Sequence, residues 1–130
     1  MNKNDNLAIK EKFAIAIQNQ QINNFEIAIN LYNEILKIEP NFIEAHNNLG
    51  VSFKALGEDQ KAISCYEKAI QIDPNLLQAQ FNLGNIFKTL GEDQKAISCY
   101  EKAIQIDPNC INAYNNLGSI FKALGEDQKA

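Results

Sequence analysis

Residues 57–75 read GEDQKAISCYEKAIQIDPN, and residues 91–109 repeat this stretch letter for letter. The two copies start 34 residues apart, and the same letters begin a third time at Gly125. A fixed period of this length is typical of repeat proteins, in which each unit packs only on its neighbours. The sequence therefore predicts a row of similar small units, whose surfaces are built from equivalent side chains rather than around one catalytic pocket.

The three prolines give the frame of these units, because Pro40, Pro74 and Pro108 follow one another at the same spacing. Aligned on them, the chain contains three complete units and part of a fourth. We expect a lead-in at residues 1–8, followed by units at residues 9–42, 43–76, 77–110 and 111–130, the last with its first helix only.

Each unit contains two amphipathic segments joined by a short turn. In the second unit, Ala45, Leu49 and Phe53 fall at helical spacing, and Gly57 follows with the freedom to adopt a left-handed conformation. A second apolar stripe begins after this glycine and stops before the proline, which cannot continue a helix. We therefore expect antiparallel helical hairpins, with Gly125 ending a helix in the fourth unit as Gly57 does in the second.

The ends of these helices carry candidate capping residues, whose side-chain oxygens can accept from unpaired backbone N–H groups. In the first unit, Asn23 takes the place of the turn glycine, because asparagine tolerates the left-handed conformation better than most residues. The expected caps are Asp59 and Asp93 for second helices, and the capping boxes Asn41–Glu44 and Asn75–Gln78 for first helices.

These positions resemble the tetratricopeptide repeat family, whose signature contains a Leu-Gly pair, aromatic residues, a small residue and a proline at fixed spacing. The resemblance covers residues 9–130 and is loosest in the first unit, where Ile15-Ala16 replaces the Leu-Gly pair. It implies an all-α fold, a right-handed α-solenoid of helix-turn-helix repeats. The matching residues are Leu49-Gly50, Phe53, Ala62, Tyr66 and Pro74 in the second unit, Leu83-Gly84, Phe87, Ala96, Tyr100 and Pro108 in the third, and Leu117-Gly118 and Phe121 in the fourth.

The glycines of the Leu-Gly pairs predict close contact between the two helices of a hairpin. Gly50, Gly84 and Gly118 have no side chain, so the second helix can approach the first closely at these points. We expect the aromatic residues of each unit to fill the remaining space between the helices.

The composition is that of an ordinary soluble protein and argues against several kinds of partner. The net charge is −4 and the chain has no arginine, the usual residue for bidentate contacts with phosphates and bases, so we expect no nucleic-acid partner. We expect no membrane partner either, because no apolar run approaches the ~20 residues that span a bilayer. Secretion is not expected, since no apolar signal segment follows the polar start. The three cysteines lack a Cys-x-x-Cys pair and fit reduced thiols in a cytoplasmic protein.

No set of residues predicts catalysis, a cofactor or a metal site. His46 is the single histidine, and no triad partner stands at a suitable spacing, so we expect a structural imidazole. Charged pairs such as Glu67-Lys68 predict a solvated outer face rather than paired catalytic carboxylates. We therefore expect that this chain is not an enzyme and needs no cofactor.

The candidate binding residues lie on the first helix of each unit, which in tetratricopeptide arrays lines a concave groove. An asparagine amide has two donors and an acceptor, so it can meet both the N–H and the C=O of an extended peptide. The asparagine column consists of Asn48, Asn82 and Asn116, flanked by Asn47, Phe81, Asn85 and Asn115. The lysine column consists of Lys54, Lys88 and Lys122.

Both columns have alternative interpretations. The asparagines either contact a peptide or are solvated residues copied from one ancestral unit, although asparagine is disfavoured within helices. The lysines either attract acidic peptide segments or add solubility near helix ends. The asparagine column resembles that of the protein O-linked N-acetylglucosamine transferases. Chaperone-binding members of the family have basic groove residues in their first and third units, where this chain has Phe13, Ile17, Gln78 and Asn82.

These observations favour a protein-interaction scaffold that binds an extended peptide in its groove. The alternative is the N-terminal, substrate-recruiting arm of a larger enzyme, such as a glycosyltransferase of the O-GlcNAc transferase type. We expect Leu117, Phe121 and Leu124 to face water where the fourth unit lacks a second helix. Self-association through that face is a third possibility, and we expect the natural protein to continue beyond Ala130.

Overall fold

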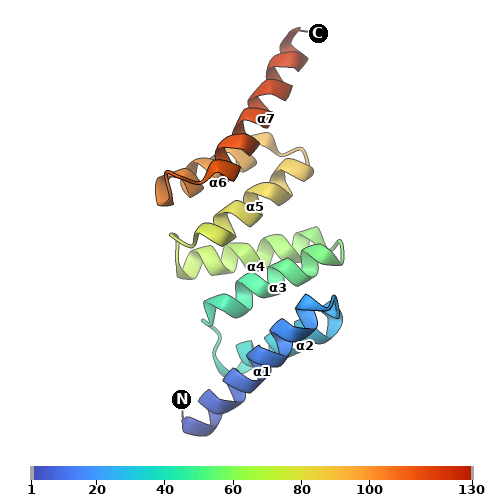
Figure 1. Ribbon diagram of the computed structural model, residues 1–130, viewed down its shortest axis with the longest axis vertical. Coiled ribbons are helices and arrows are strands. Elements are labelled where there is room, and N and C mark those ends of the chain that lie inside the picture. Colours follow the sequence, from blue (N-terminus) through green and yellow to red (C-terminus); the bar gives the residue numbers. More distant parts are fainter. Residues whose placement is uncertain (1, 130) are drawn as a thin grey trace. The chain divides into compact units, whose positions relative to one another are not determined.

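The computed structural model describes residues 2–129, with side chains described for residues 2–126. Over that range the chain forms seven α-helices and no strand, which confirms the all-α helical-repeat fold (Figure 1). The helices divide between two compact units. In unit 1, which ends at Asp73, they are α1 (Lys3–Gln21), α2 (Phe25–Ile38), α3 (Ile43–Ala55) and α4 (Asp59–Ile72). In unit 2, which begins at Pro74, they are α5 (Leu77–Thr89), α6 (Asp93–Ile106) and α7 (Ile111–Lys129).

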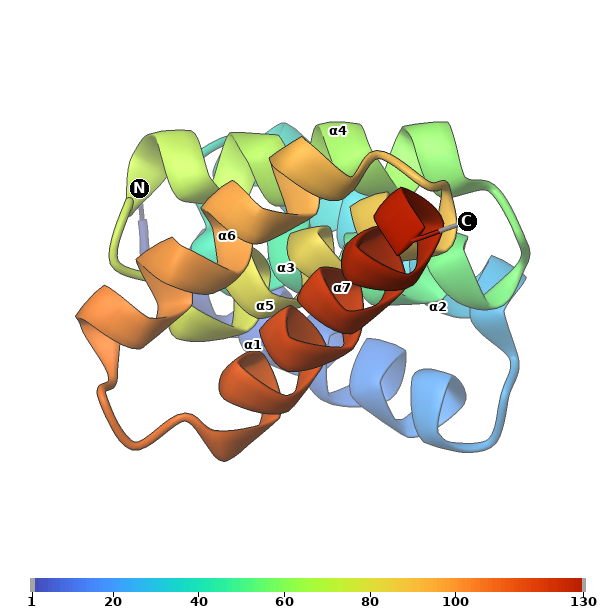
Figure 2. The ribbon, with the colours of Figure 1, turned by 90° about the horizontal axis from the view of Figure 1, so that it is seen from above.

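Consecutive helices pair as hairpins, α1 with α2 and α3 with α4 in unit 1, and α5 with α6 in unit 2 (Figures 1 and 2). The turns inside these hairpins use the residues that the sequence predicts. Gly57 and Gly91 have φ +77°, and Asn23 has φ 66°, the left-handed region that favours glycine and asparagine. Each such residue reverses the chain so that the second helix folds back along the first.

The predicted caps of the second helices are wrong. Asp59 and Asp93 are the first helical residues, preceded by Glu58 and Glu92, and neither helix has a side-chain cap hydrogen bond. The first helices α3 and α5 have the apolar cap residues Phe42 and Leu76, one position after the predicted caps Asn41 and Asn75. The apolar stripes of these helices are buried, and in proteins tertiary packing outweighs local helix signals.

One helix cap was not predicted from the sequence, because it lies in the lead-in. The helix α1 begins at Lys3, and the side chain of Asn2 accepts from the backbone N–H of Asp5 at 2.8 Å. Most of the lead-in residues therefore belong to the first helix.

Close contact between paired helices is confirmed at two of the three glycines. A Cβ atom built on Gly50 would lie 2.7 Å from the ring of Tyr66, and one built on Gly84 would lie 2.9 Å from the ring of Tyr100. Both rings are buried, so the glycines hold open the space that the tyrosines fill. Gly118 has no atom within 4 Å of its Cβ position among the described residues, because α7 has no second helix there.

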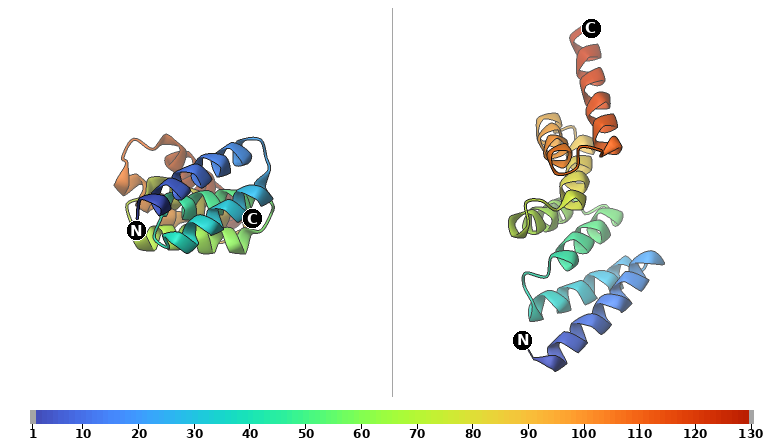
Figure 3. Two further views of the ribbon diagram at one scale, coloured as in Figure 1. Left: turned by 90° about the horizontal axis from the view of Figure 1, so that it is seen from below. Right: turned by 60° about the vertical axis from the view of Figure 1, so that its left-hand side comes forward.

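The fourth repeat differs from expectation at Gly125, which lies inside α7 instead of ending a helix. No second helix follows α7 within the described residues, so its last turns gain more from continued backbone hydrogen bonds than from a reversal of the chain. Beyond its contact with α6, α7 extends alone (Figure 3). Leu117 is buried rather than solvated, since it belongs with Ala113 and Ile120 to the buried stripe of α7, whereas Phe121 is 54% exposed, as predicted.

A buried hydroxyl in α3 gives a stability prediction. Ser52 is fully buried, and its Oγ has no hydrogen-bond partner among the described residues. The equivalent positions in α5 and α7 hold the apolar residues Ile86 and Ile120. Ser52→Ala removes the unpaired hydroxyl and raises helix propensity, so we expect it to stabilise the protein by about 1 kcal/mol in urea unfolding. A less stable variant would show that the hydroxyl has a partner such as a bound water.

Candidate functional site

In unit 2, a tyrosine from the second helix joins two asparagines from first helices. The Tyr100 hydroxyl on α6 donates to Asn85 Oδ1 on α5 at 2.5 Å. The Asn116 amide on α7 donates to the same Oδ1 at 3.0 Å and to the Tyr100 hydroxyl oxygen at 3.3 Å. Three consecutive helices thus contribute one side chain each to a closed hydrogen-bond network, which we call the Tyr100 network.

The Tyr100 network leaves part of the Asn116 amide available to a ligand. Its two acceptors lie only 2.5 Å apart, so a single N–H of Asn116 can be shared between them. The second N–H and the Oδ1 are then the groups with which this half-buried side chain can meet a ligand. Because the network fixes the orientation of the amide in advance, less side-chain entropy is lost on binding.

Unit 1 contains a related arrangement around Tyr32, which is fully buried on α2. Its hydroxyl donates to Gln20 Oε1 on α1 at 2.6 Å, and its side chain is hydrogen-bonded to Asn48 on α3. Tyr32 therefore links its own first helix to the first helix of the next repeat, as Tyr100 does in unit 2. Sequence analysis missed these tyrosine–asparagine bonds, although the fixed spacing of both residues in the repeat was the available signal.

The remaining predicted asparagines and Phe81 differ in their exposure. Asn47 is only 6% exposed and is part of the packing of unit 1 rather than its surface. Phe81 is half-buried, with its ring 5.9 Å from the Tyr100 ring, so it supports the Tyr100 network. Asn82 is half-buried and Asn115 is exposed. Asn85 and Asn116 are thus the two predicted site residues that the structure joins directly.

Two residues of the lysine column, Lys54 and Lys88, lie near the ends of their first helices, whereas Lys122 lies within α7, which continues to Lys129. Lys54 and Lys122 are exposed, and Lys88 is half-buried. Lys54 and Lys88 stand in the last turns of α3 and α5, where a positive charge is favoured by the helix dipole. The helix dipole is therefore a sufficient local reason for Lys54 and Lys88 at these positions. Their charges also remain accessible to an acidic ligand.

Titration of Tyr100 provides a test of the Tyr100 network. Burial raises the pKa of Tyr100 to about 12, and the hydrogen bond from Asn116 opposes this rise. The folded state holds this proton more tightly than the unfolded chain, whose tyrosines titrate near 10. The resulting stabilisation is therefore complete below about pH 10 and is lost as the pH rises toward 12.

We expect Tyr100→Phe to lower the free energy of unfolding at pH 7 by about 1 kcal/mol, because the variant lacks the hydroxyl that bridges the asparagines. Between pH 9 and 12, the variant should lose less stability than the parent protein, since one shifted tyrosine is gone. Urea unfolding at several pH values measures both effects. Equal losses for the two proteins would show that Tyr100 does not titrate as described.

His46 has the structural role that the sequence predicts. Its Nε2 lies 2.7 Å from the carbonyl oxygen of Pro40, the proline that precedes α3. At the equivalent position in unit 2, Gln80 Nε2 donates to the carbonyl oxygen of Pro74 at 3.3 Å. Both side chains therefore fix the loop that leads into their own helix.

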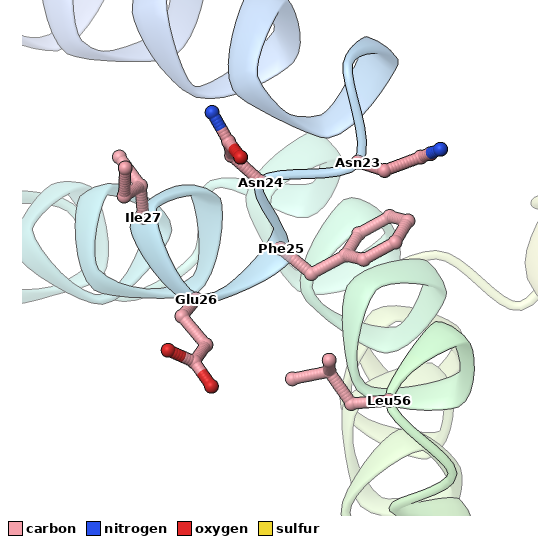
Figure 4. Close-up of a pocket in the computed structure, with 6 residues that line it drawn as sticks. All are labelled: Asn23, Asn24, Phe25, Glu26, Ile27 and Leu56. Atoms are coloured by element: carbon pink, nitrogen blue, oxygen red, sulfur yellow. The ribbon is translucent and has the colours of Figure 1, made fainter.

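An open hollow of about 260 Å³ lies at the turn between α1 and α2, where it also meets the end of α3 (Figure 4). Sequence analysis missed it, although the first unit departs from the repeat there. Phe25 and Ile27 occupy positions that hold aspartate and lysine in the two later units. In those units the lysine stacks over a phenylalanine, as Lys61 does on Phe53, and the first unit lacks this charged cover. The lining residues are Asn23, Asn24, Phe25, Glu26, Ile27 and Leu56.

Neither a metal-binding cluster nor a membrane-spanning helix occurs among the described residues. Among the described residues, no group of three or more His, Cys, Asp or Glu side chains could hold a metal ion. None of the helices over that same range is long and apolar enough to cross a membrane. The three cysteines are free thiols, and burial raises the pKa of Cys65 to about 11, which suits packing rather than reactivity.

Helical hairpins at a 34-residue period, with polar columns on their first helices, define a helical-repeat protein of the kind that serves protein interaction. A family model described as TPR repeat matches residues 21–57 and 84–125, and one described as Tetratricopeptide repeat matches residues 43–76. The chain belongs to the tetratricopeptide repeat family. Repeats of this family are generally non-catalytic protein-interaction modules.

Solved structures show the same fold. The crystal structure of MamA is 27% identical with a TM-score of 0.86, covering 90% of this chain and 68% of that one. The first TPR of Spaghetti (RPAP3), bound to an HSP90 peptide, is 19% identical with a TM-score of 0.87, covering 92% and 94%. A mutant O-GlcNAc transferase of Thermobaculum terrenum is 23% identical with a TM-score of 0.82, covering 92% of this chain and 23% of the enzyme. Among curated protein sequences, none matches this chain.

Proposed function

We propose that this protein-interaction scaffold binds an extended peptide along its first helices, with the asparagine column meeting the peptide backbone. The observation that carries the proposal is the Tyr100 network, which orients the Asn116 amide while leaving one N–H and the Oδ1 for a ligand. Such contacts involve no peptide side chain, so many sequences should bind, each with modest affinity.

The lysine column supplies the preference among these peptides. Lys54 and Lys122 are exposed, and neither forms an ion pair among the described residues. Their charges lie on a molecule with a net charge of −4, so an acidic peptide gains local attraction there while a basic peptide gains none. We therefore propose that acidic, extended peptides are the preferred ligands.

A test replaces Asn48, Asn82 and Asn116 together by alanine. We expect at least tenfold weaker binding of a 12-residue peptide of Asp, Ser, Thr and Gly, because three backbone contacts are lost. Binding is measured by fluorescence anisotropy, and circular dichroism at a temperature below both melting transitions checks that helicity is kept.

The matched control replaces Asn30 and Asn33, which are exposed on the second helix α2. This variant should bind the peptide like the parent protein. Equal binding by the triple variant would refute the asparagine proposal, and equal binding of a lysine-rich peptide would refute the preference for acidic ligands.

A second candidate function is that of a substrate-recruiting arm in a larger enzyme. The likeness to the Thermobaculum terrenum O-GlcNAc transferase favours it, although this chain spans only 23% of that enzyme. The sequence of the gene beyond the codon for Ala130 tests it, since a catalytic domain in the same reading frame is required.

A further inference from the structure

The hollow at the turn between α1 and α2, which we call the turn hollow, combines three apolar side chains with one carboxylate. Phe25 and Ile27 come from the start of α2, and Leu56 follows the end of α3. Ile27 is 49% exposed and Leu56 is 43% exposed, so part of this apolar surface is open to solvent. The side chains of Glu26 and Leu56 border the space between the start of α2 and the end of α3 (Figure 4).

The electrostatics of the turn hollow favour a cation. Glu26 is exposed and forms no ion pair among the described residues, whereas the later units have the neutral Gln60 and Gln94 at its position. The helices α1 and α3 end at Gln21 and Ala55, each within two residues of a residue that lines the hollow. Helix C-termini carry a partial negative charge. The N-terminus of α2 has the opposite sign, but Glu26 stands in its first turn and offsets it.

The later units show which side chain fits a ring and a carboxylate at a hairpin turn. Lys61 Nζ lies 5.5 Å from the centroid of the Phe53 ring and 3.6 Å from Glu58 Oε2. The equivalent lysine of α6, Lys95, makes the same two kinds of contact at 5.4 Å and 3.5 Å. The first unit has a ring and a carboxylate at its turn but no lysine of its own to join them.

The volume of the turn hollow suits a single side chain. Its 260 Å³ is below the ~300–1,000 Å³ of pockets that hold drug-sized molecules. A lysine side chain has an apolar stem that can cover Phe25 and Leu56, and an ammonium group at its tip that can pair with Glu26. An apolar side chain would leave this carboxylate unpaired, and an acidic one would be repelled by it.

We propose that the turn hollow is a docking site for a lysine side chain supplied by a partner protein. The stem lies on Phe25 and Leu56, and the ammonium group pairs with Glu26. This site goes beyond the proposed peptide binding and is separate from the lysine column. Lys54 stands two residues before Leu56, which places the two side chains about 200° apart around α3.

The test titrates the complete chain, labelled with ¹⁵N, with a single lysine blocked by an acetyl and a methylamide group. We expect saturable chemical-shift changes at residues 22–27 and 55–57. Norleucine with the same blocking groups has the four-carbon stem without the ammonium group. It should bind about tenfold more weakly, because the ion pair and the contact of the cation with the ring are both lost. The triple asparagine variant should bind the blocked lysine like the parent protein, since one residue cannot make the contacts of an extended peptide.

Two variants test the residues of the turn hollow. Glu26→Gln keeps the shape of the side chain and removes its charge, so we expect about threefold weaker binding of the blocked lysine. Phe25→Leu keeps an apolar surface and removes the ring, and a similar loss is expected. The matched control is Glu67→Gln, the same change of charge at an exposed position of α4, which should bind like the parent protein. Circular dichroism should show all three variants folded.

Each of four results would overturn the proposal. Without saturable shifts at these residues there is no site, and equal binding of the blocked norleucine would mean that the hollow takes apolar side chains. Equal weakening by Glu26→Gln and Glu67→Gln would show a general effect of charge. A dimer that sedimentation detects in the parent protein and not in Glu26→Gln would assign the hollow to a lysine of a second copy.

Discussion

Gly84→Leu is expected to lower the free energy of unfolding by about 3 kcal/mol and the melting temperature by about 10 °C. A Cβ at this position would lie 2.9 Å from Tyr100 Cε1 and 3.1 Å from Cys99 Cβ. Both neighbours are buried, so they cannot move aside without opening the hairpin of α5 and α6. Thermal and urea unfolding, followed by circular dichroism, measure the effect.

The same substitution in α7 is the control. Gly118 occupies the equivalent register, but nothing lies within 4 Å of its Cβ position among the described residues. Gly118→Leu should therefore stabilise α7 by about 1 kcal/mol, the difference in helix propensity. If both variants lose stability equally, the cost arises within the helix itself and not from the contact with the tyrosine.

Tyr32→Ala is expected to destabilise unit 1 by about 4 kcal/mol, the cost of removing a large buried aromatic side chain. Tyr32 is fully buried, its ring packs edge-on against Phe13 with centroids 6.1 Å apart, and its hydroxyl bonds to Gln20. The substitution leaves a cavity between α1, α2 and α3 and removes the hydrogen bond that reaches Asn48. Urea unfolding measures the loss.

Tyr114→Ala is the matched control, because Tyr114 is half exposed on α7. It should change the free energy of unfolding by no more than about 0.5 kcal/mol. Tyr32→Phe separates the contribution of the buried ring from that of the hydroxyl hydrogen bond, since it keeps the ring and removes only the hydroxyl. A loss of about 1 kcal/mol is expected for that variant. A small effect of Tyr32→Ala would contradict its position at the centre of the unit 1 core.

The structure adds a packing role to the asparagine column. From the sequence, the asparagines were interpreted either as peptide contacts or as solvated residues copied in part from one ancestral unit. In the structure, Asn116 and Asn48 are hydrogen-bonded to tyrosines of the preceding repeat. Such bonds between neighbouring repeats give a physical reason for asparagine within a helix, where it is otherwise disfavoured.

Several local features followed from the sequence, because they depend on residues close together in the chain. The left-handed turns at Asn23, Gly57 and Gly91 are examples, since their conformation requires residues that tolerate positive φ. The glycine contacts with Tyr66 and Tyr100 also followed, because the repeated signature fixes their spacing. The N-caps of the second helices did not, since Glu58 and Asp59 are neighbouring polar residues and either could precede the helix.

The sequence by itself determined the repeat, its period and the hairpin, because these are written in spacing and turn chemistry within 34 residues. Only the tertiary structure decided whether equivalent residues of the repeats are covered or exposed. Gly84 and Gly118 follow the same Leu, yet one lies under a tyrosine ring and the other is open, because a second helix covers α5 and none of the described residues covers that face of α7. Burial depends on the neighbours that the chain brings together, and identical letters do not record those neighbours.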